Sequence, residues 1–420
     1  MKFSKDSEQM MSIMMDDFEK FIKKKSSSQQ RTFDRIMKNF HSEVKSADKF
    51  TDKLWKDGKV KVNIREIHDF RSIRHTSLLS STYTPANIKK YIKSNIKGVI
   101  NYKFSAGGRS ITVNFYLMHN NEFNQLIKFD KLVYKMIMWL KMVSSYTRSR
   151  CSRTLKVNCY MTPLKKILPN SPFTVLSSNH ANTAVTTSCT ADGEICLYRK
   201  EEIFKVFIHE TFHVLGLDFS SMSNTLLNSK VHLIFPISSS YNLYEGYTEF
   251  WATIMNCVFT AYYMSKDSQD ANDFYLYAEY CIAFEQFFSL FQCVKVLDFM
   301  GLSYHNLHGK DNLSERARKY LYKEETNIFA YYVIKCILLY NFIPFINWCK
   351  SNNDNILSFY RSKDNLMRFY RFIMLHYRSK QFNAELDRVQ KVLKLHKSNV
   401  ADKDNKMIAK TMRMTIIELL

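Results

Sequence analysis

The stretch KVFIHETFHVLGLDFS, residues 205–220, decides how the rest of this 420-residue chain is interpreted. An α-helix places residues four apart on one face, so the imidazoles of His209 and His213 can bind the same metal ion. Glu210 lies at the edge of that face, where its carboxylate can polarise a metal-bound water. The pattern therefore predicts a helix that carries two metal ligands and a general base.

The residues around this motif favour the same helix. Glu201 and Glu202 suit a helix N-terminus because acidic side chains interact favourably with the helix dipole there. An apolar stripe follows at helical spacing, and Gly216 is a natural stop after the last turn. Composition alone would produce H-E-x-x-H in only about one or two per cent of such chains. The alternative is a core helix whose two histidines are hydrogen-bonded and bind no metal.

A third ligand is needed, because a catalytic zinc usually has three protein ligands and a water. Two acids downstream compete for this position. Asp218 is close, in H-E-x-x-H-x-x-G-x-D, but the metzincin pattern that it approaches places the third ligand at the position of Phe219. Glu245 is the stronger candidate.

Glu245 lies in the segment LYEGYTEFW, residues 243–251, after three serines that can cap a helix. It follows His213 by 32 residues, which leaves room for a loop and a return to the metal. Glu249, one helical turn later, can accept the distal N–H of a metal-bound histidine. The alternative is a pair of solvated surface acids, and the apolar neighbours argue against it: Tyr244, Phe250, Trp251 and Ile254.

H-E-x-x-H followed by E-G-Y-T-E in a second helix resembles the gluzincin metallopeptidases. The resemblance implies that His209, His213 and Glu245 bind Zn²⁺. It also implies that Glu210 is the general base and that Glu249 supports one of the ligands.

The resemblance covers roughly residues 150–260, and Tyr244 stands where the family usually has asparagine. This departure leaves open whether the expected activity is that of an exopeptidase or an endopeptidase. The wider stretch RKEEIFKVFIHETFH, residues 199–213, also looks like uncharacterised metallopeptidase-like proteins of large DNA viruses.

The pattern along the chain predicts an α+β fold with three regions. Residues 1–95 form a basic, helical extension. Residues 96–260 alternate short strands with helices, which fits a zincin-like catalytic domain with a small mixed β-sheet and an active-site helix. Residues 261–420 have helical periodicity almost throughout, so we expect a mostly helical C-terminal domain.

Two segments are expected to form particular strands of the predicted sheet. Residues 111–117 alternate strictly between apolar and polar side chains after Gly107 and Gly108, which predicts a strand that follows a hairpin turn. Residues 179–183 are expected to form an edge strand, to which an extended peptide could add by main-chain pairing.

Composition and charge restrict the setting. The formal net charge of +22 is spread along the whole chain and suggests weak association with acidic surfaces or nucleic acid, with a solvated lysine-rich surface as the alternative. The nine cysteines lack C-x-x-C spacing and predict buried, reduced thiols. We see neither a signal peptide nor a convincing transmembrane segment. We therefore expect a protein that is not secreted and that acts in the cytoplasm, or in a host cytoplasm or virion if it is viral.

Three functions fit these observations. The first is a zinc metallopeptidase that acts on a peptide or protein substrate. The second is a catalytically silent zincin-fold protein with a structural or virion-associated role, although a structural zinc site has no need of Glu210. The third is a basic nucleic-acid-binding protein, which lacks a recognisable module here. For the oxyanion donor of a peptidase, the candidates are Tyr304, His305 and His308, with ordinary surface residues as the alternative.

Overall fold

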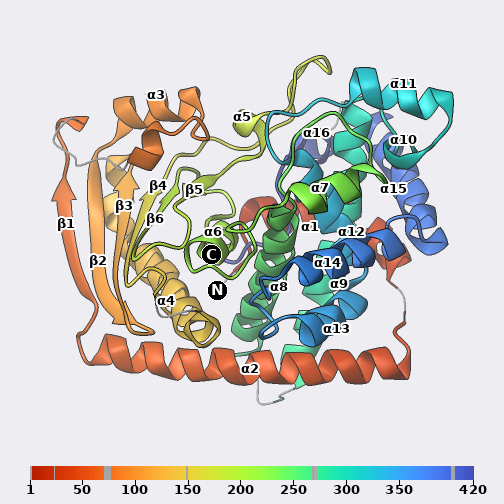
Figure 1. Cartoon of the computed structure of the whole chain (residues 1–420). Coiled ribbons are helices and arrows are strands. Elements are labelled where there is room, and N and C mark those ends of the chain that lie inside the picture. Colours follow the sequence, from red (N-terminus) through yellow and green to blue (C-terminus); the bar gives the residue numbers. More distant parts are fainter. Residues whose placement is uncertain are drawn as a thin grey trace. The chain divides into compact units, whose positions relative to one another are not determined.

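The chain folds as an α+β protein, as the sequence predicts. The computed structural model describes residues 2–22, 24–70, 77–147, 150–266, 270, 272–398 and 403–420. Its contacts divide the chain into two units, and Figure 1 labels their helices and strands. The helical unit comprises Met1–Arg35, Lys166–Ala181 and Asp218–Leu419, and the sheet unit comprises Ile36–Lys165, Asn182–Leu217 and Leu420.

The sheet unit is built around a six-stranded mixed sheet with the order β1-β2-β3-β4-β6-β5. β2 pairs antiparallel with β1 and β3, the neighbours β3, β4 and β6 run parallel, and β5 runs antiparallel to β6. β1 and β5 are therefore the two edges. The strands are β1 (Lys61–Glu66), β2 (Gly98–Ala106), β3 (Arg109–Leu117), β4 (Thr154–Tyr160), β5 (Ala184–Thr186) and β6 (Asp192–Leu197).

A two-residue turn joins β2 to β3. Gly107 and Gly108 have φ angles of +57° and +73°, the left-handed conformation that a tight hairpin turn requires at both central positions. Ala106 and Arg109 face each other as the last pair of the ladder. The predicted hairpin and the strand over residues 111–117 are confirmed.

Helices pack on both faces of the sheet. Successive side chains of a strand point to opposite faces, so one set of apolar residues meets α4 (Leu126–Val143) and α6 (Ile203–Val214). The other face is partly covered by α3 (Ala86–Asn95), whose Ile88 and Ile92 belong to a buried cluster with strand residues that include Tyr116, Tyr160 and Tyr198.

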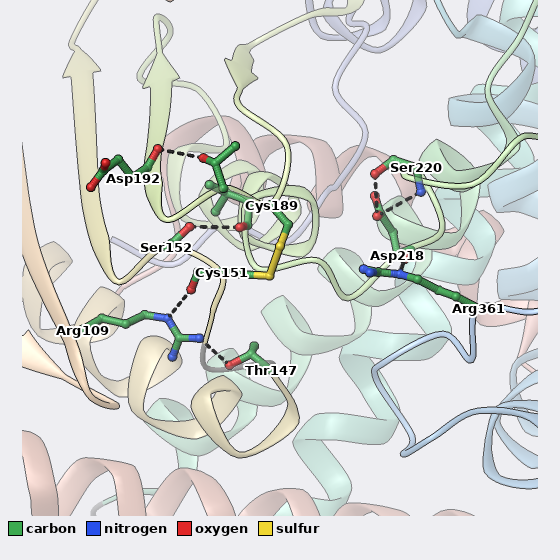
Figure 2. The surroundings of a disulfide bond; sticks show 11 residues. Arg109, Thr147, Cys151, Ser152, Cys189, Asp192, Asp218, Ser220 and Arg361 are labelled. Atoms are coloured by element: carbon green, nitrogen blue, oxygen red, sulfur yellow. Dashed lines mark hydrogen bonds between the residues drawn. A yellow bond between two sulfur atoms is a disulfide. The ribbon is translucent and has the colours of Figure 1, made fainter.

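A disulfide corrects one sequence-based expectation. Cys151 and Cys189, both in the sheet unit, are bonded, with their Cα atoms 4.9 Å apart (Figure 2). The Arg109 guanidinium donates to the Cys151 carbonyl and to the Thr147 hydroxyl, and so ties this end of the sheet together. The other seven cysteines are free and buried, as expected. Burial raises the pKa of Cys159, which fits a structural thiol.

The helical unit packs around two long helices, α8 (Leu243–Ser265) and α9 (Asn272–Phe299). α9 is apolar enough by length and composition to cross a membrane, but 83% of its apolar window is buried inside the protein. An all-round apolar helix of this kind is also typical of a protein core.

The expectation of a mostly helical C-terminal region is confirmed, because the described residues from α9 onward form helices almost throughout.

α2 (Ser27–Lys56) begins in the helical unit and continues into the sheet unit. The remaining helices of the helical unit are α1 (Lys5–Phe21), α5 (Ser178–Ala181), α7 (Thr225–His232), α10 (Tyr304–His308), α11 (Asn312–Leu321), a π-helical segment (Phe329–Ile334), α12 (Lys335–Tyr340), α13 (Phe342–Asn352), α14 (Lys363–His376), α15 (Lys380–Ser398) and α16 (Lys403–Lys410).

Candidate metal centre

α6 carries the H-E-x-x-H motif, as predicted. Its N-cap residue, Glu202, has a left-handed backbone with φ of +58°. Gly216, with φ of +66°, follows the helix, and its amide and that of Leu217 donate to carbonyls of the last turn. A left-handed glycine that satisfies the last carbonyls is a frequent helix stop, so the predicted end of the helix is confirmed.

His209 and His213 lie together on one face of α6. Their Nε2 atoms are 3.1 Å apart, and their ring centroids are 4.9 Å apart. His209 is 5% exposed and Glu210 is 7% exposed, whereas His213 is half-buried. The two imidazoles therefore present adjacent nitrogen donors in a largely water-excluded part of the sheet unit.

Side chains from distant parts of the sequence hold α6 in place. The Trp139 indole N–H of α4 donates to the Thr211 hydroxyl over 2.7 Å, and that hydroxyl donates to the Ile208 carbonyl over 2.6 Å. The Trp139 ring also stacks on Phe212, the next residue of the motif. These contacts fix the turn of α6 that lies between the two histidines.

The C-terminal end of α6 is fixed by the loop that enters β4. The Ser152 hydroxyl donates to the Val214 carbonyl over 2.9 Å. Gly193 on β6 permits this approach, because a Cβ atom there would lie 2.2 Å from the Ser152 oxygen and 2.7 Å from a Val214 methyl. Sequence reasoning missed Trp139, Ser152 and Gly193, since no local pattern links them to the motif.

Glu245 and Glu249 lie on α8 of the helical unit, also as predicted. Glu245 is in the first turn, and its amide donates to the Asn242 carbonyl over 3.1 Å. Glu249, one turn later, is 3% exposed. The two histidines belong to the sheet unit and Glu245 belongs to the helical unit. It therefore stays a prediction that Glu245 binds the same metal ion as the two histidines.

A buried lysine compensates the charge of Glu249. The Lys335 ammonium lies 3.9 Å from a Glu249 carboxylate oxygen and also donates to the Met414 carbonyl. Both charged side chains are almost fully buried, so removing either one would weaken the compensation of the other's charge in a medium of low polarity.

Asp218, the alternative third ligand, is buried and engaged in its own loop. One of its carboxylate oxygens accepts from the Ser220 amide over 3.1 Å and from the Ser220 hydroxyl over 2.7 Å (Figure 2). Its carbonyl accepts from the Arg361 guanidinium over 3.0 Å. These bonds close a turn, which is an ordinary structural role for aspartate.

The three candidates for an oxyanion donor lie on α10. The Tyr304 hydroxyl donates to the Tyr377 carbonyl over 2.7 Å, so it has no proton left for a substrate. His305 is exposed, and its ring nitrogen lies 3.3 Å from an Asp311 carboxylate oxygen. His308 packs among aromatic rings, and burial, reinforced by nearby positive groups, lowers its pKa to about 4.

The expected edge strand lies slightly later in the sequence than predicted. Residues 178–181 form the short helix α5 and residues 182 and 183 belong to no strand, so the prediction of a strand over residues 179–183 is wrong. The edge strand is β5, which begins at Ala184 and contacts α6. A strand of three residues is too short for its alternation to predict where it starts.

Comparison with known proteins yields one distant relationship. The chain is 32% identical over 118 residues to "Uncharacterized protein R210" of Acanthamoeba polyphaga mimivirus. The match covers 27% of this chain and spans only 28% of the relative's length. No known protein family and no solved structure matches the chain. The relationship supports the expectation of a viral protein and carries no information on activity.

Proposed function

We propose that this protein is a zinc-dependent metallopeptidase whose metal ligands are His209, His213 and Glu245. The observation that carries the proposal is the pair of imidazoles on α6, with Nε2 atoms 3.1 Å apart. Two nitrogens bound to zinc at 2.0–2.1 Å in tetrahedral geometry lie about 3.3 Å from each other. The pair therefore needs only a small adjustment to bind one ion.

The donor chemistry supports the same proposal. Two imidazoles and one carboxylate are a set of donors that could hold a metal ion, and catalytic zinc sites use this combination with a fourth position left for water. Glu245 is preferred to Asp218, because the Asp218 carboxylate closes a turn with Ser220, and the described residues that could hold a metal ion together are His209, His213 and Glu245.

When bound, zinc would lower the pKa of a water molecule and polarise the carbonyl of the peptide bond. The Glu210 carboxylate would take the proton of that water and deliver it to the leaving amine. Glu249 would accept the remaining N–H of one imidazole, which fixes the tautomer and makes the ring a better donor. The Lys335 ammonium would compensate the negative charge of the Glu249 carboxylate.

An extended peptide is the substrate class that fits the sheet unit. β5 is an edge strand, and it contacts the helix that carries the two histidines. Main-chain pairing with such an edge binds a peptide with little dependence on its side chains. We therefore place the peptide along β5 and its scissile bond near Glu210.

The test is cleavage of a peptide library by the purified full chain, combined with its zinc content. We expect close to one zinc per chain. Glu210→Gln should keep the zinc and lower cleavage at least a hundredfold, because it removes the general base. Glu315→Gln, an exposed substitution on α11, is the matched control and should change neither.

The alternative is a zincin-fold protein with a structural or virion-associated role. It predicts that the wild-type chain holds zinc but cleaves no peptide, and that Glu210→Gln has no effect on any activity of the protein. That combination would overturn the proposed peptidase and leave the metal site intact.

A further inference from the structure

β1 is an open edge of the sheet. All six of its residues are exposed, whereas the other sheet strands are largely buried. Among the residues that the structure describes, β1 has β2 on one side and no strand on the other (Figure 1). An exposed edge presents unpaired main-chain donors and acceptors to any extended segment that approaches it.

The direction of these main-chain groups follows from the ladder. The Ile67 amide donates to the Lys97 carbonyl over 2.8 Å, toward β2. In an antiparallel pair, alternate residues bond to the same neighbour, so Lys61, Asn63 and Arg65 bond to β2. The amides and carbonyls of the intervening residues, Val62 and Ile64 among them, therefore face away from the sheet.

Successive side chains of β1 point to opposite faces, so Lys61, Asn63 and Arg65 share one face, and Val62, Ile64 and Glu66 share the other. Val62 and Ile64 are 43% and 45% exposed, which is unusual for strand residues of this type. Lys61 lies directly opposite Lys103 of β2, on the same face as Arg65. Like charges directly opposite each other destabilise a sheet. The ion pair described beside them joins Lys59 to Asp57 and involves neither Lys61 nor Lys103. A carboxylate supplied from outside would relieve this repulsion.

Cavities flank both ends of the strand. One, of about 450 Å³, lies at the start of β1, and its lining combines three apolar side chains with three lysines and three hydroxyl groups: Lys59, Lys61, Lys103, Ser105, Ser110 and Thr112. The other, of about 650 Å³, lies at the end of β1, and its lining contains Lys93 and Lys97 together with Glu66. Ammonium and hydroxyl donors around a cavity suit carboxylate groups.

We propose that β1 is a docking edge for an extended, acidic segment of a partner protein, which pairs with the main chain of β1 as an added strand. Its carboxylates would lie over Lys61, Lys103 and Arg65, and its apolar residues would cover Val62 and Ile64. This interaction is independent of the proposed peptidase activity, since it uses neither α6 nor β5.

A labelled peptide of alternating glutamate and valine, eight residues long, tests the proposal by fluorescence anisotropy with the full chain. We expect saturable binding that Lys61→Glu combined with Arg65→Glu weakens at least tenfold. Ile64→Pro should have a similar effect, because proline removes an outward N–H without removing a bond to β2. Ile64→Thr keeps that N–H and should retain at least half of the wild-type affinity.

Circular dichroism melting of each variant verifies that the fold is kept. Two results would overturn the proposal. One is equal binding of a peptide with the same charge whose valines are replaced by proline, since that peptide cannot pair as a strand. The other is full displacement by a short DNA duplex with no effect of Ile64→Pro, which would show that the surface binds polyanions without strand addition.

Discussion

The hydroxyl of Thr211, which lies between the two histidines of α6, takes part in two hydrogen bonds. It accepts the Trp139 indole N–H and donates to the Ile208 carbonyl. Trp139 and Thr211 are both buried. When a buried N–H group loses its acceptor, the free energy of removing that group from water is no longer offset by a hydrogen bond.

Thr211→Val should therefore lower the free energy of unfolding by about 1–3 kcal/mol, because valine has nearly the same shape and leaves the Trp139 N–H without a partner. Urea unfolding of the full chain measures the change. Thr82→Val, at an exposed position before α3, is the control and should shift stability by no more than about 0.5 kcal/mol. Equal stability of wild type and Thr211→Val would show that the hydrogen bond does not hold α6.

At the scale of single residues, the sequence predicts those residues of the site that lie close to one another in the chain. His209, Glu210 and His213 fall on one helix, so their spacing alone brings them together. Trp139 is 72 residues away from Thr211, and Ser152 is 62 residues away from Val214. Such contacts depend on how α4 and the β4 loop pack, and single-sequence patterns do not contain that information.

Among the elements, α8 depends on a close approach that only glycine permits. A Cβ atom at Gly246 would lie 2.7 Å from a methyl carbon of Ile334 and 3.1 Å from the Ala330 carbonyl oxygen. Both neighbours belong to the π-helical segment of the helical unit. Gly246 thus lets α8 pack tightly in the turn that separates Glu245 from Glu249.

Gly246→Ala should destabilise the protein by about 1–3 kcal/mol through overpacking, although alanine is the better helix former. Thermal unfolding of Gly246→Ala, Ile334→Ala and the double variant tests whether the clash with Ile334 causes the loss of stability. In the background of Ile334→Ala the clash is partly removed, so the two changes together should cost at least about 1 kcal/mol less than their sum. Strict additivity would contradict the packing argument.

The elements with strong periodicity are those that the sequence predicts correctly. The β2–β3 hairpin and α6 follow from alternation, helical spacing and well-placed glycines. The first part of the expected edge strand is a helical turn instead, because residues 178–181 carry polar side chains that suit either conformation. Short segments of this kind take their structure from the neighbours against which they pack.

At the scale of the whole molecule, the Cys151–Cys189 disulfide closes a loop with a sequence separation of 38 residues. A loop of this length corresponds to about 4 kcal/mol in the chain-entropy model, and measured values are commonly 2–4 kcal/mol. Reduction should lower the unfolding free energy by about that amount. The double variant Cys151→Ser, Cys189→Ser should be equally destabilised and insensitive to reductant.

A thiol count provides the control. The denatured, unreduced chain should react at seven cysteines, and the reduced chain at all nine. Nine reactive thiols before reduction, together with no effect of reductant on unfolding, would contradict the disulfide.

Neither the disulfide nor the third ligand could be derived from spacing alone. Cysteine pairing is decided by how the loop before β4 meets the loop before β6, which only the assembled sheet determines. The choice between Glu245 and Asp218 likewise depends on tertiary packing, which the spacing of residues in a single sequence does not contain. The hydrogen bonds of Asp218 to Ser220 are the structural observation that favours Glu245.

The zinc content of three variants tests the central claim most directly. Purified wild-type chain, Glu245→Gln and Asp218→Asn are dialysed against a fixed concentration of free zinc, and bound metal is measured by mass spectrometry. We predict close to one zinc per chain for wild type and Asp218→Asn, and at least a hundredfold weaker binding for Glu245→Gln. A folded wild-type chain that holds no zinc, or a Glu245→Gln variant that binds zinc as tightly as wild type, would contradict the proposed centre.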